Sequence, residues 1–479
     1  PSVGEGDEPA NALFLNLGGE FTDVADLAGV GDRGFGQGPA VGDINGDGFP
    51  DLYVTNLGRN VLYLNNGDGT FENITEPSGT GGDHYSLSAA FADLSGDGLP
   101  DLYVVNYLGG DSMELQCLDQ GKRTQCSPLR FPGQPDQVFV NLGNGQFDEV
   151  AQAAMPSSEG PGRGMGLLVA DFDGRQGLDV YVANDLMANR LYLNQSPSIP
   201  SDNTVSFSEQ GRISGVAYDI RGRLQGSMGI AAEDVNRNGM LDIFVTNYWR
   251  ESNNYFSQVA QSPQTLFNEC AVEMNLSLAS LQAVGWGTQF MDADLDGDWD
   301  LIVANGHLDE NTGPPETKQS PHLFENVERQ RFQPAPAGDY FSGKYFARAV
   351  ARLDWNGDGL PDVCITHRAA PVALLTNTSQ RLGNFVAIEL RGVESSRDAI
   401  GAIVEVEAGG QRWFASLMSG SGFSAANQRQ ILLGLGPQTE VEKLTIRWPR
   451  GEPQVFENVP LDTRSLIVQG DDTLYSLPE

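Results

Sequence analysis

Oxygen-bearing side chains stand at alternate positions in the stretch "VGDINGDGFPDLYVTN", directly before an apolar run that reads as a strand. Asp43, Asn45, Asp47 and Asp51 take positions 1, 3, 5 and 9 of this loop, and Gly48 takes position 6. Glycine adopts a positive φ at little steric cost, so it can close the turn there. Alternate side chains of a tightly curled loop point towards one centre, so the spacing predicts a cation site made of oxygen ligands.

The same spacing recurs in four further loops. The corresponding residues are Asp93, Ser95, Asp97 and Asp101 in the second loop, Asp234, Asn236, Asn238 and Asp242 in the fourth, Asp292, Asp294, Asp296 and Asp300 in the fifth, and Asp354, Asn356, Asp358 and Asp362 in the sixth. Apposed carboxylates without a cation repel one another, which argues against metal-free Asx and glycine turns in all five loops. A flexible cage of charged oxygens suits Ca²⁺ better than Mg²⁺. We therefore expect about five calcium sites, with the tightest in the fifth loop, where all four residues are carboxylates.

The third loop departs from the pattern. Asp171, Asp173 and Asp179 are present, but position 5 is Arg175 and position 6 is Gln176. A guanidinium group at position 5 can neutralise the carboxylates in place of a metal ion. We therefore expect this loop to be a degenerate metal loop that binds no calcium.

Between the acidic loops the chain reads as short strands. In the first repeat these are "GPAVGDI", "DLYVTN", "NVLYLNN" and "TFENITE", separated by turn residues. Val54, at position 12, lies in a strand, whereas an EF-hand needs a glutamate there and then a helix. Four strands in each repeat of roughly 60 residues, without comparable helical periodicity, predict the blades of an all-β propeller.

The charge of the chain limits its partners. The chain has 29 Lys and Arg residues and 64 Asp and Glu residues, which gives a formal net charge of -35. Nucleic acids and anionic membranes require a basic footprint, so we expect neither as a partner. No apolar run reaches roughly 18 residues, so we expect no membrane insertion. A metal cation is the partner that the acidic residues favour.

The first residue and the cysteines favour an exported protein. The chain begins with Pro1, which fits removal of a signal peptide, although a trimmed chain would begin in the same way. Cys117 and Cys126 lie in "CLDQGKRTQC", where a local disulfide would close a short loop. Cys270 and Cys364 are ambiguous, and Cys364 lies in a strand pattern typical of a buried free thiol. We expect a secreted, cell-surface or periplasmic location.

Several motifs resemble known families. "GDINGDGFPDLYVTN" and its copies are similar to FG-GAP or VCBS repeats, the blades of integrin-type propellers. "VANDLMANRLYLN", "GSMGIAAEDVNRNGMLDIFVTN" and "WGTQFMDADLDGDWDLIVANGH" resemble proteins related to cartilage acidic protein. "RDAIGAIVEVEAGG", "SGSGFSAANQRQILLGLG" and "VEKLTIRWPRGE" resemble the C-terminal ASPIC/UnbV module of that family. The resemblance spans about Asn11 to Gln469; it implies fold and calcium binding, and says little about activity.

The resemblance and the strand pattern together predict two domains. Residues 1–380 should form a calcium-binding integrin-type β-propeller, and residues 381–479 a separate small β-sandwich. Six acidic loops are visible, while the family most often has seven blades. "NALFLNLGGEFTDVADLAG" matches the later outer strand pairs without a preceding loop, so it reads as the outer half of a blade. Seven blades are therefore favoured, with six as the alternative.

Each second strand ends on a polar residue, on the face opposite the acidic loops. These residues are Asn56, Asn106, Asn184, Asn247, Asn305 and His367. They either cap the following turns or form a polar ring around the central channel, together with Arg190. The candidate ligand face consists of Asn184, Asp185, Trp249, Arg250, Asn305, His307 and Arg368. The insertion from Leu108 to Pro135, which carries Cys117 and Cys126, should stand on the same face.

The favoured function is a calcium-stabilised binding or assembly protein of the adhesion type. It would recognise a protein or glycan partner, alone or as a subunit of a larger extracellular assembly. The alternative is a secreted propeller hydrolase or lyase that acts on a carbohydrate or a related small substrate. Only four histidines occur, and HExxH, GxSxG and P-loop motifs are absent from the sequence. His307 is the best catalytic candidate, but no residue is assigned as catalytic.

Overall fold

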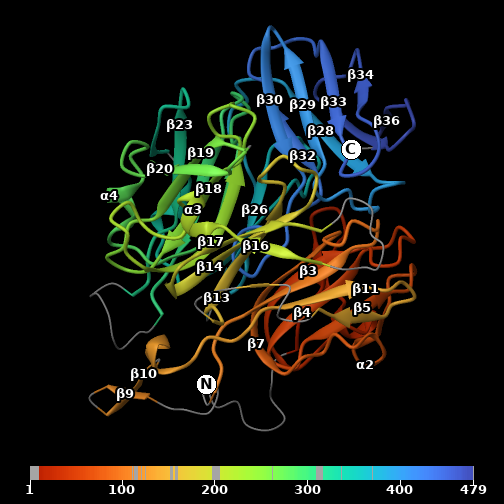
Figure 1. Cartoon of the computed structure of the whole chain (residues 1–479). Coiled ribbons are helices and arrows are strands. Elements are labelled where there is room, and N and C mark those ends of the chain that lie inside the picture. The colour runs from red at the N-terminus through yellow and green to blue at the C-terminus, as the bar shows by residue number, and fades with distance from the viewer. Residues whose placement is uncertain are drawn as a thin grey trace.

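A computed structural model describes residues 10–110, 112, 117–119, 121–124, 126–150, 155, 156, 160–196, 205–261, 263–308, 317–335, 337–368 and 370–477. The fold is all-β, with a propeller-like body below two smaller C-terminal sheets (Figure 1). The described helices are short: α1 (Ala25–Ala28), α2 (Thr75–Ser78), α3 (Gly211–Ser214), α4 (Ser277–Ser280), α5 (Asp339–Ser342) and the 3₁₀ turn Pro128–Arg130. No described helix is long and apolar enough to cross a membrane.

Four sheets form the propeller-like body. The first contains β3 (Phe35–Gly42), β4 (Asp51–Gly58), β5 (Val61–Asn65), β6 (Phe71–Asn73), β7 (His84–Ala92), β8 (Asp101–Asn106), β11 (Gln137–Asn141) and β12 (Phe147–Glu149). The second contains β13 (Gly164–Ala170), β14 (Asp179–Met187), β15 (Arg190–Asn194), β16 (Phe207–Glu209), β17 (Gln225–Glu233), β18 (Asp242–Asn247), β19 (Asn254–Ala260), β20 (Leu266–Glu269) and β31 (Ser419–Gly420). The third contains β21 (Gly285–Met291), β22 (Asp300–Asn305), β23 (His322–Val327) and β24 (Arg331–Pro334), and the fourth β25 (Ala347–Leu353), β26 (Asp362–His367) and β27 (Ala373–Leu375).

Six consecutive antiparallel units make up these sheets, each with one acidic loop between its first two strands. Two sheets are large because neighbouring units join, at Leu57 and Tyr85 and at Asp185 and Gly226. Inner strands such as β8, "DLYVVN", are buried along their whole length, which explains their near-continuous apolar sequence. The expected count of seven blades is not confirmed.

Two small hairpins lie outside these units. They are β1 (Phe14–Asn16) with β2 (Phe21–Asp23), and β9 (Cys117–Asp119) with β10 (Lys122–Thr124). The expected disulfide joins Cys117 to Cys126 in the second hairpin, and Cys270 and Cys364 are free thiols. This hairpin projects from the end of the molecule opposite the C-terminal sheets (Figure 1).

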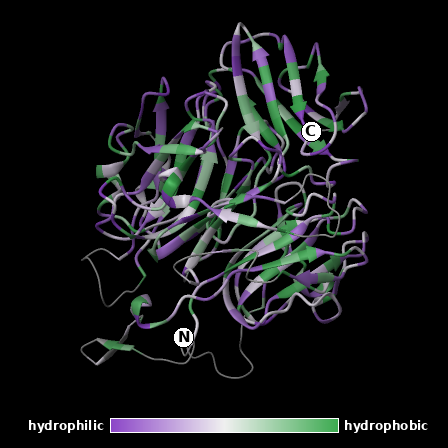
Figure 2. Cartoon of the chain, in the orientation of Figure 1, coloured by the Kyte–Doolittle hydropathy of each residue, from purple (hydrophilic) through white to green (hydrophobic). Residues whose placement is uncertain are grey.

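The C-terminal sheets form a sandwich that shares its core with the propeller. One sheet contains β28 (Phe385–Arg391), β32 (Ile431–Gly434), β35 (Arg464–Val468) and β36 (Tyr475–Ser476), and the other β29 (Ile403–Ala408), β30 (Gln411–Ser416), β33 (Lys443–Arg447) and β34 (Gln454–Phe456). Hydrophobic residues run along their strands (Figure 2). Val404 and Ile446 of the sandwich belong to the same buried cluster as Leu94 and Val235 of the acidic loops. The sandwich and the propeller therefore share one buried cluster.

A segment of the sandwich enters the centre of the propeller. This central segment, residues 419–428, pairs with the inner strands at Gly420 with Leu168 and at Gly422 with Ile230. It also reaches the sixth unit, where the amide N–H of Arg352 donates to Asn427. Residues 419–428 thus occupy the centre of the propeller.

Candidate metal centres

Each acidic loop is curled around its leading aspartate. In the first loop, Asp43 accepts hydrogen bonds from the backbone N–H of Asp47 at 3.1 Å and of Gly48 at 2.8 Å. Asn45 accepts a second bond from Asp47 at 3.0 Å, and Gly48 has the left-handed φ of 95° that the turn requires. These bonds hold positions 1, 3 and 5 close together in the loop.

The aspartate at position 9 anchors each loop to its unit. Asp51 accepts hydrogen bonds from the N–H of Ile44 at 2.9 Å, inside the loop, and of Asn65 at 2.7 Å, on β5. Asp300 in the fifth loop does the same with Ala293 and Asn326. These hydrogen bonds fix the loop without a metal ion. The side chains that could bind an ion are therefore held in place by the strands of the same unit.

Carboxylate oxygens converge most closely in the third and fifth loops. The ligand atoms of Asp292, Asp294 and Asp300 lie within 4.8 Å of one another. The side chains of Asp171, Asp173 and Asp179 form an equally compact group. Both groups could hold a metal ion, and the fifth loop is the one with the most carboxylates.

Some of these buried oxygens lack a hydrogen-bond donor among the described residues. They are Asp292 Oδ1 and, at position 3 of the second loop, Ser95 Oγ. Asp173 Oδ2 also accepts no hydrogen bond, but Arg175 Nε lies 3.5 Å from it. Leaving a buried polar oxygen without a partner costs free energy. A hard cation in each of these two loops would satisfy Asp292 Oδ1 and Ser95 Oγ, so the donor set fits a metal ion bound by oxygen.

The third loop keeps the shape of the others in spite of its sequence. Gln176 at position 6 has a φ of 67°, although it is not a glycine, and its N–H donates to Asp171 at 3.2 Å. Arg175 lies 3.5 Å from Asp173, but its side chain is 55% exposed. The guanidinium therefore supplies counter-charge to one of the three carboxylates, Asp173, while Asp171, Asp173 and Asp179 remain close together.

Burial raises the pKa of several carboxyl groups in these loops. Desolvation by burial raises the pKa of Asp300 to about 8, that of Asp234 to about 7 and that of Asp51 to about 6. At Asp292 burial acts first and neighbouring carboxylates second, and the pKa lies well above its usual range. These groups need a counter-charge to ionise in place.

The C-terminal sandwich covers the acidic-loop face. At the first loop, Asp398 accepts a hydrogen bond from the N–H of Asp43 at 2.8 Å, and Arg397 lies 3.5 Å from the Asp43 carboxylate. At the fifth loop, the N–H of Leu382 donates to the carbonyl oxygen of Asp294 at 2.7 Å. Sequence reasoning missed these contacts, because no local pattern links residues 355 positions apart.

Further contacts extend the cover over the other loops. Arg237 of the fourth loop stacks on Trp413 at 4.6 Å and donates to Gln411. Leu178 of the third loop and Ile400 of the sandwich belong to one buried cluster. An ion in any of these loops would therefore lie close to the junction between propeller and sandwich.

Some residues of the candidate ligand face are buried, and others are accessible to solvent. Asn184 and Asn305 are at most 1% exposed, and Asn184 donates to the carbonyl oxygen of Ala188 in the next turn. Asn247 donates to the carbonyl oxygen of Ser252 in the next turn, whereas Asn106 donates to that of Pro135, at the end of the insertion. These asparagines thus bond to the backbone of the connections that follow their strands.

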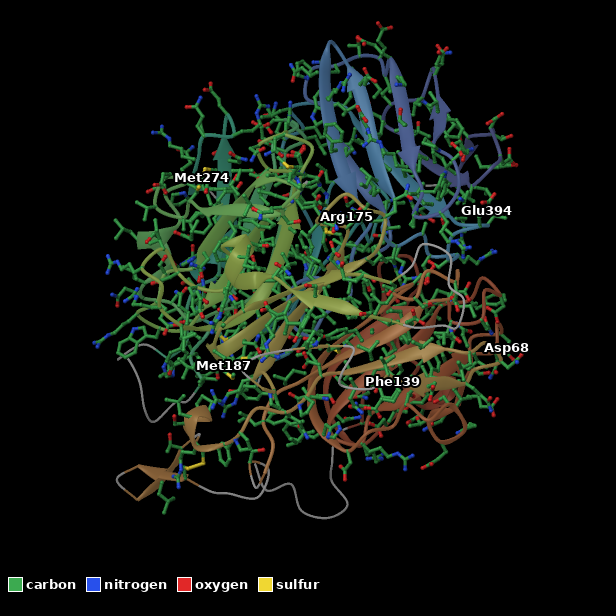
Figure 3. All side chains as sticks on the ribbon, viewed as in Figure 1. Asp68, Phe139, Arg175, Met187, Met274 and Glu394 are labelled. Atoms are coloured by element: carbon green, nitrogen blue, oxygen red, sulfur yellow. A yellow bond between two sulfur atoms is a disulfide. The ribbon has the colours of Figure 1, made fainter. Side chains whose placement is uncertain are left out.

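His307, the best catalytic candidate, is 2% exposed and contacts Tyr248 and Trp249. Arg250 is exposed and stacks over the Trp249 ring at 4.1 Å. Asp185 accepts a hydrogen bond from Tyr107 at 2.5 Å, and Arg368 is exposed. Arg250 and Arg368 are therefore exposed, and Trp249 and Asp185 are half-buried. The disulfide of the hairpin lies at the end of the molecule away from the sandwich (Figure 3).

Comparison with known proteins supports the repeat and the C-terminal domain. Residues 392–474 match the family described as ASPIC and UnbV, and residues 3–54 and 43–104 match the FG-GAP-like repeat. No curated protein matches the chain.

Solved structures resemble the chain only distantly. An Agrocybe aegerita lectin that recognises non-reducing terminal N-acetylglucosamine has 16% identity and a TM-score of 0.41, over 74% of this chain and 84% of the lectin. A Bacillus licheniformis rhamnogalacturonan lyase has 13% identity and a TM-score of 0.34, over 72% and 73% of the two chains. A putative exo-beta-1,3-galactanase from Bifidobacterium bifidum has 11% identity and a TM-score of 0.34, over 66% and 95%. TM-scores this low carry no argument about function.

The raised pKa values predict how the metal-free protein responds to pH. An aspartate whose pKa is raised on folding stabilises the protein below its unfolded pKa of about 4, and this contribution is lost as pH rises through the folded value. With chelator present, the melting temperature should therefore fall between pH 5 and about 8, the folded pKa of Asp300. Scanning calorimetry across this range measures the trend, and a melting temperature that rises with pH in chelator would contradict it.

Proposed function

We propose that this chain, which combines FG-GAP-like repeats with a C-terminal ASPIC and UnbV domain, is a calcium-stabilised binding or assembly protein. Its place of action would be the cell surface, the extracellular space or the periplasm. The observation that carries the proposal is the set of buried, unsatisfied oxygens in loops of one geometry, such as Asp292 Oδ1 and Ser95 Oγ.

Calcium is the cation that fits these loops best. The donors are carboxylate, amide and hydroxyl oxygens, without the His or Cys ligands that zinc prefers. The loops led by Asp43, Asp93, Asp234, Asp292 and Asp354 have the full pattern. A calcium ion would neutralise carboxylate charges in each loop. This attraction offsets the cost of desolvation, which raises the pKa of the carboxyl groups.

The position of the loops indicates a structural role for the metal. They lie under the C-terminal sandwich, where Arg397 and Asp398 reach the first loop and Leu382 the fifth. Ions here would lower the negative charge of the loops at the junction between propeller and sandwich, and they would stabilise the folded protein because they bind the folded loops.

The contacts of the N-terminal hairpin, β1 with β2, support the presence of a seventh blade in the propeller. Asn141, at the end of β11, donates to the carbonyl oxygen of Ile44 in the preceding acidic loop. Asn16, at the end of β1, donates in the same way to the carbonyl oxygen of Trp355 in the sixth loop. We infer that β1 and β2 are the outer half of a seventh blade that follows β25–β27.

Partner binding belongs on the face opposite the sandwich. There the exposed Arg250 stacks on Trp249, and Arg368 and the disulfide hairpin project into solvent. Tryptophan and arginine supply much of the free energy in protein interfaces. A protein or a glycan is the class of partner that such a surface fits.

Removal of calcium should destabilise the whole protein. One site at a hundredfold excess over its Kd contributes about 2.7 kcal/mol, so several sites together should raise the melting temperature by about 10 °C or more. Calorimetry in Ca²⁺, in Mg²⁺ and in EGTA measures this difference.

A matched pair of variants shows whether the loops are responsible. Asp292→Asn should reduce the calcium-dependent gain, whereas Asp68→Asn, an exposed aspartate outside the loops (Figure 3), should keep it. Equal melting temperatures in Ca²⁺ and EGTA would refute the calcium assignment.

The ligand face makes a separate prediction. On an array of immobilised glycans and extracellular proteins, the double variant Trp249→Ala/Arg250→Ala should lose about 30-fold or more in affinity for any ligand of the wild type. Its calcium-dependent melting should not change, because both residues lie away from the loops. Unchanged binding by the double variant would place the partner elsewhere.

A further inference from the structure

The strand β1 corresponds to the third strand of each unit, but one of its edges is open. Its sequence, "NALFLN", matches "NVLYLN" around β5. In the six units the third strand pairs with the second, as β5 does with β4 and β11 with β8. In the part of the chain that the structure describes, β1 pairs with β2 alone. The backbone groups on its other edge are therefore available to a further strand.

Phe14 of β1 is exposed where five units bury an aromatic ring. In those units the ring lies opposite the residue that follows the position-9 aspartate on the second strand. The aromatic residues are Tyr63, Phe139, Tyr192, Phe256 and Phe324. They are at most 4% exposed, whereas Phe14 is 52% exposed. Among the described residues, Phe14 thus lacks the inner strands that cover the other five rings.

The sixth unit exposes the face that precedes this open position. Cys364 of β26 is half-buried, and Thr366 is exposed. The residues at the position of Cys364 in the other five units are 0% exposed, because a following unit covers them. They are Tyr53, Tyr103, Tyr181, Phe244 and Ile302.

The first unit exposes the face that follows the open position. Leu52 and Val54 of β4 are half-buried. Their equivalents in the second unit, Leu102 and Val104, are 0% exposed and share a buried cluster with Tyr53 of the preceding unit. The same two positions are also buried in the third, fourth and fifth units. Apolar faces of the sixth and first units therefore border one open position, which we call the seventh position.

A backbone N–H in β1 indicates which element would fill the seventh position. In all six units, the N–H two residues after the position of Phe14 donates to the position-9 aspartate of the acidic loop. Asn65 donates in this way to Asp51 at 2.7 Å. Asn16 takes the same place in β1, where no described carboxylate accepts a hydrogen bond from its N–H. A hairpin with an acidic loop would satisfy this donor.

We propose that the seventh position binds a β-hairpin of a partner polypeptide, whose two strands are joined by an acidic loop. The second strand of the hairpin pairs with the open edge of β1 and covers Phe14. Its two faces pack on Cys364 of the sixth unit and on Leu52 and Val54 of the first. Addition of strands to an open edge is a common mode of peptide recognition. The equivalent hairpin of the sixth unit spans residues 347–367, and residues 1–9, outside the described part of the chain, are shorter than that.

This inference rests on the seventh blade proposed above and goes beyond it by naming the class of partner that completes the blade. It is separate from the surface around Trp249 and Arg250. A partner can bind at that surface whether or not a hairpin fills the seventh position.

Maleimide labelling of the free thiols, followed by mass spectrometry, tests the proposal in the presence of Ca²⁺. The probe is a synthetic peptide with the sequence of residues 38–56, which is the inner hairpin of the first unit. At about 10-fold above its Kd, the peptide should slow labelling of Cys364 by about 10-fold, because it covers that face of β26. Labelling of Cys270, the free thiol that follows β20, should not change.

Matched variants show where the peptide binds, with its affinity measured by fluorescence anisotropy. Phe14→Ala should weaken binding by about 30-fold or more, because the bound hairpin buries this ring. Leu278→Ala, at an exposed leucine of α4, should bind the peptide as the wild type does. A peptide with Val54→Pro lacks an N–H that an inner strand needs, so it should not protect Cys364. Melting temperatures check that both protein variants are folded.

The double variant Trp249→Ala/Arg250→Ala separates this proposal from the partner surface, and it should bind the peptide unchanged. The proposal is overturned if the peptide does not slow the labelling of Cys364, if the proline peptide protects equally well, or if Phe14→Ala binds as tightly as the wild type. Loss of peptide binding in the double variant would also overturn it. So would a dimer, detected by light scattering, in which Cys364 is already protected, because a second copy would then fill the seventh position.

Discussion

The structure depends on one electrostatic constraint: the acidic loops bury several carboxylates with too little positive charge beside them. Each acidic loop folds around its leading aspartate by backbone hydrogen bonds, as Asp43 does with Asp47 and Gly48. These bonds leave oxygens such as Asp292 Oδ1 without a partner, and burial raises the pKa of Asp292 well above its usual range. The calcium ions that we propose would answer this constraint in the five loops that share the full pattern.

The C-terminal sandwich belongs to the same arrangement. It lies over the acidic loops, brings Arg397 to the first of them and sends residues 419–428 into the propeller. With the channel filled and the acidic face covered, we propose the opposite end, where Trp249 and Arg250 lie, as the surface for a macromolecular partner.

Local features were predictable from sequence, and long-range features were not. The ligand positions around Asp43, the strands that follow each loop and the Cys117–Cys126 disulfide all depend on residues a few positions apart. The cover of the loops depends on pairs such as Asp43 and Asp398, 355 positions apart, for which a single sequence has no periodic signal. The buried role of Asn184 was also open from sequence, because an asparagine at a strand end can cap a turn or face a ligand.

The most direct test of this account is hydrogen exchange followed by mass spectrometry, with and without calcium. If ions in the loops hold the propeller and the sandwich together, EGTA should speed exchange in the acidic loops and in residues 419–436 together, well before the outer strands unfold. Faster exchange in the loops alone, with residues 419–436 equally protected in EGTA and in Ca²⁺, would contradict the account.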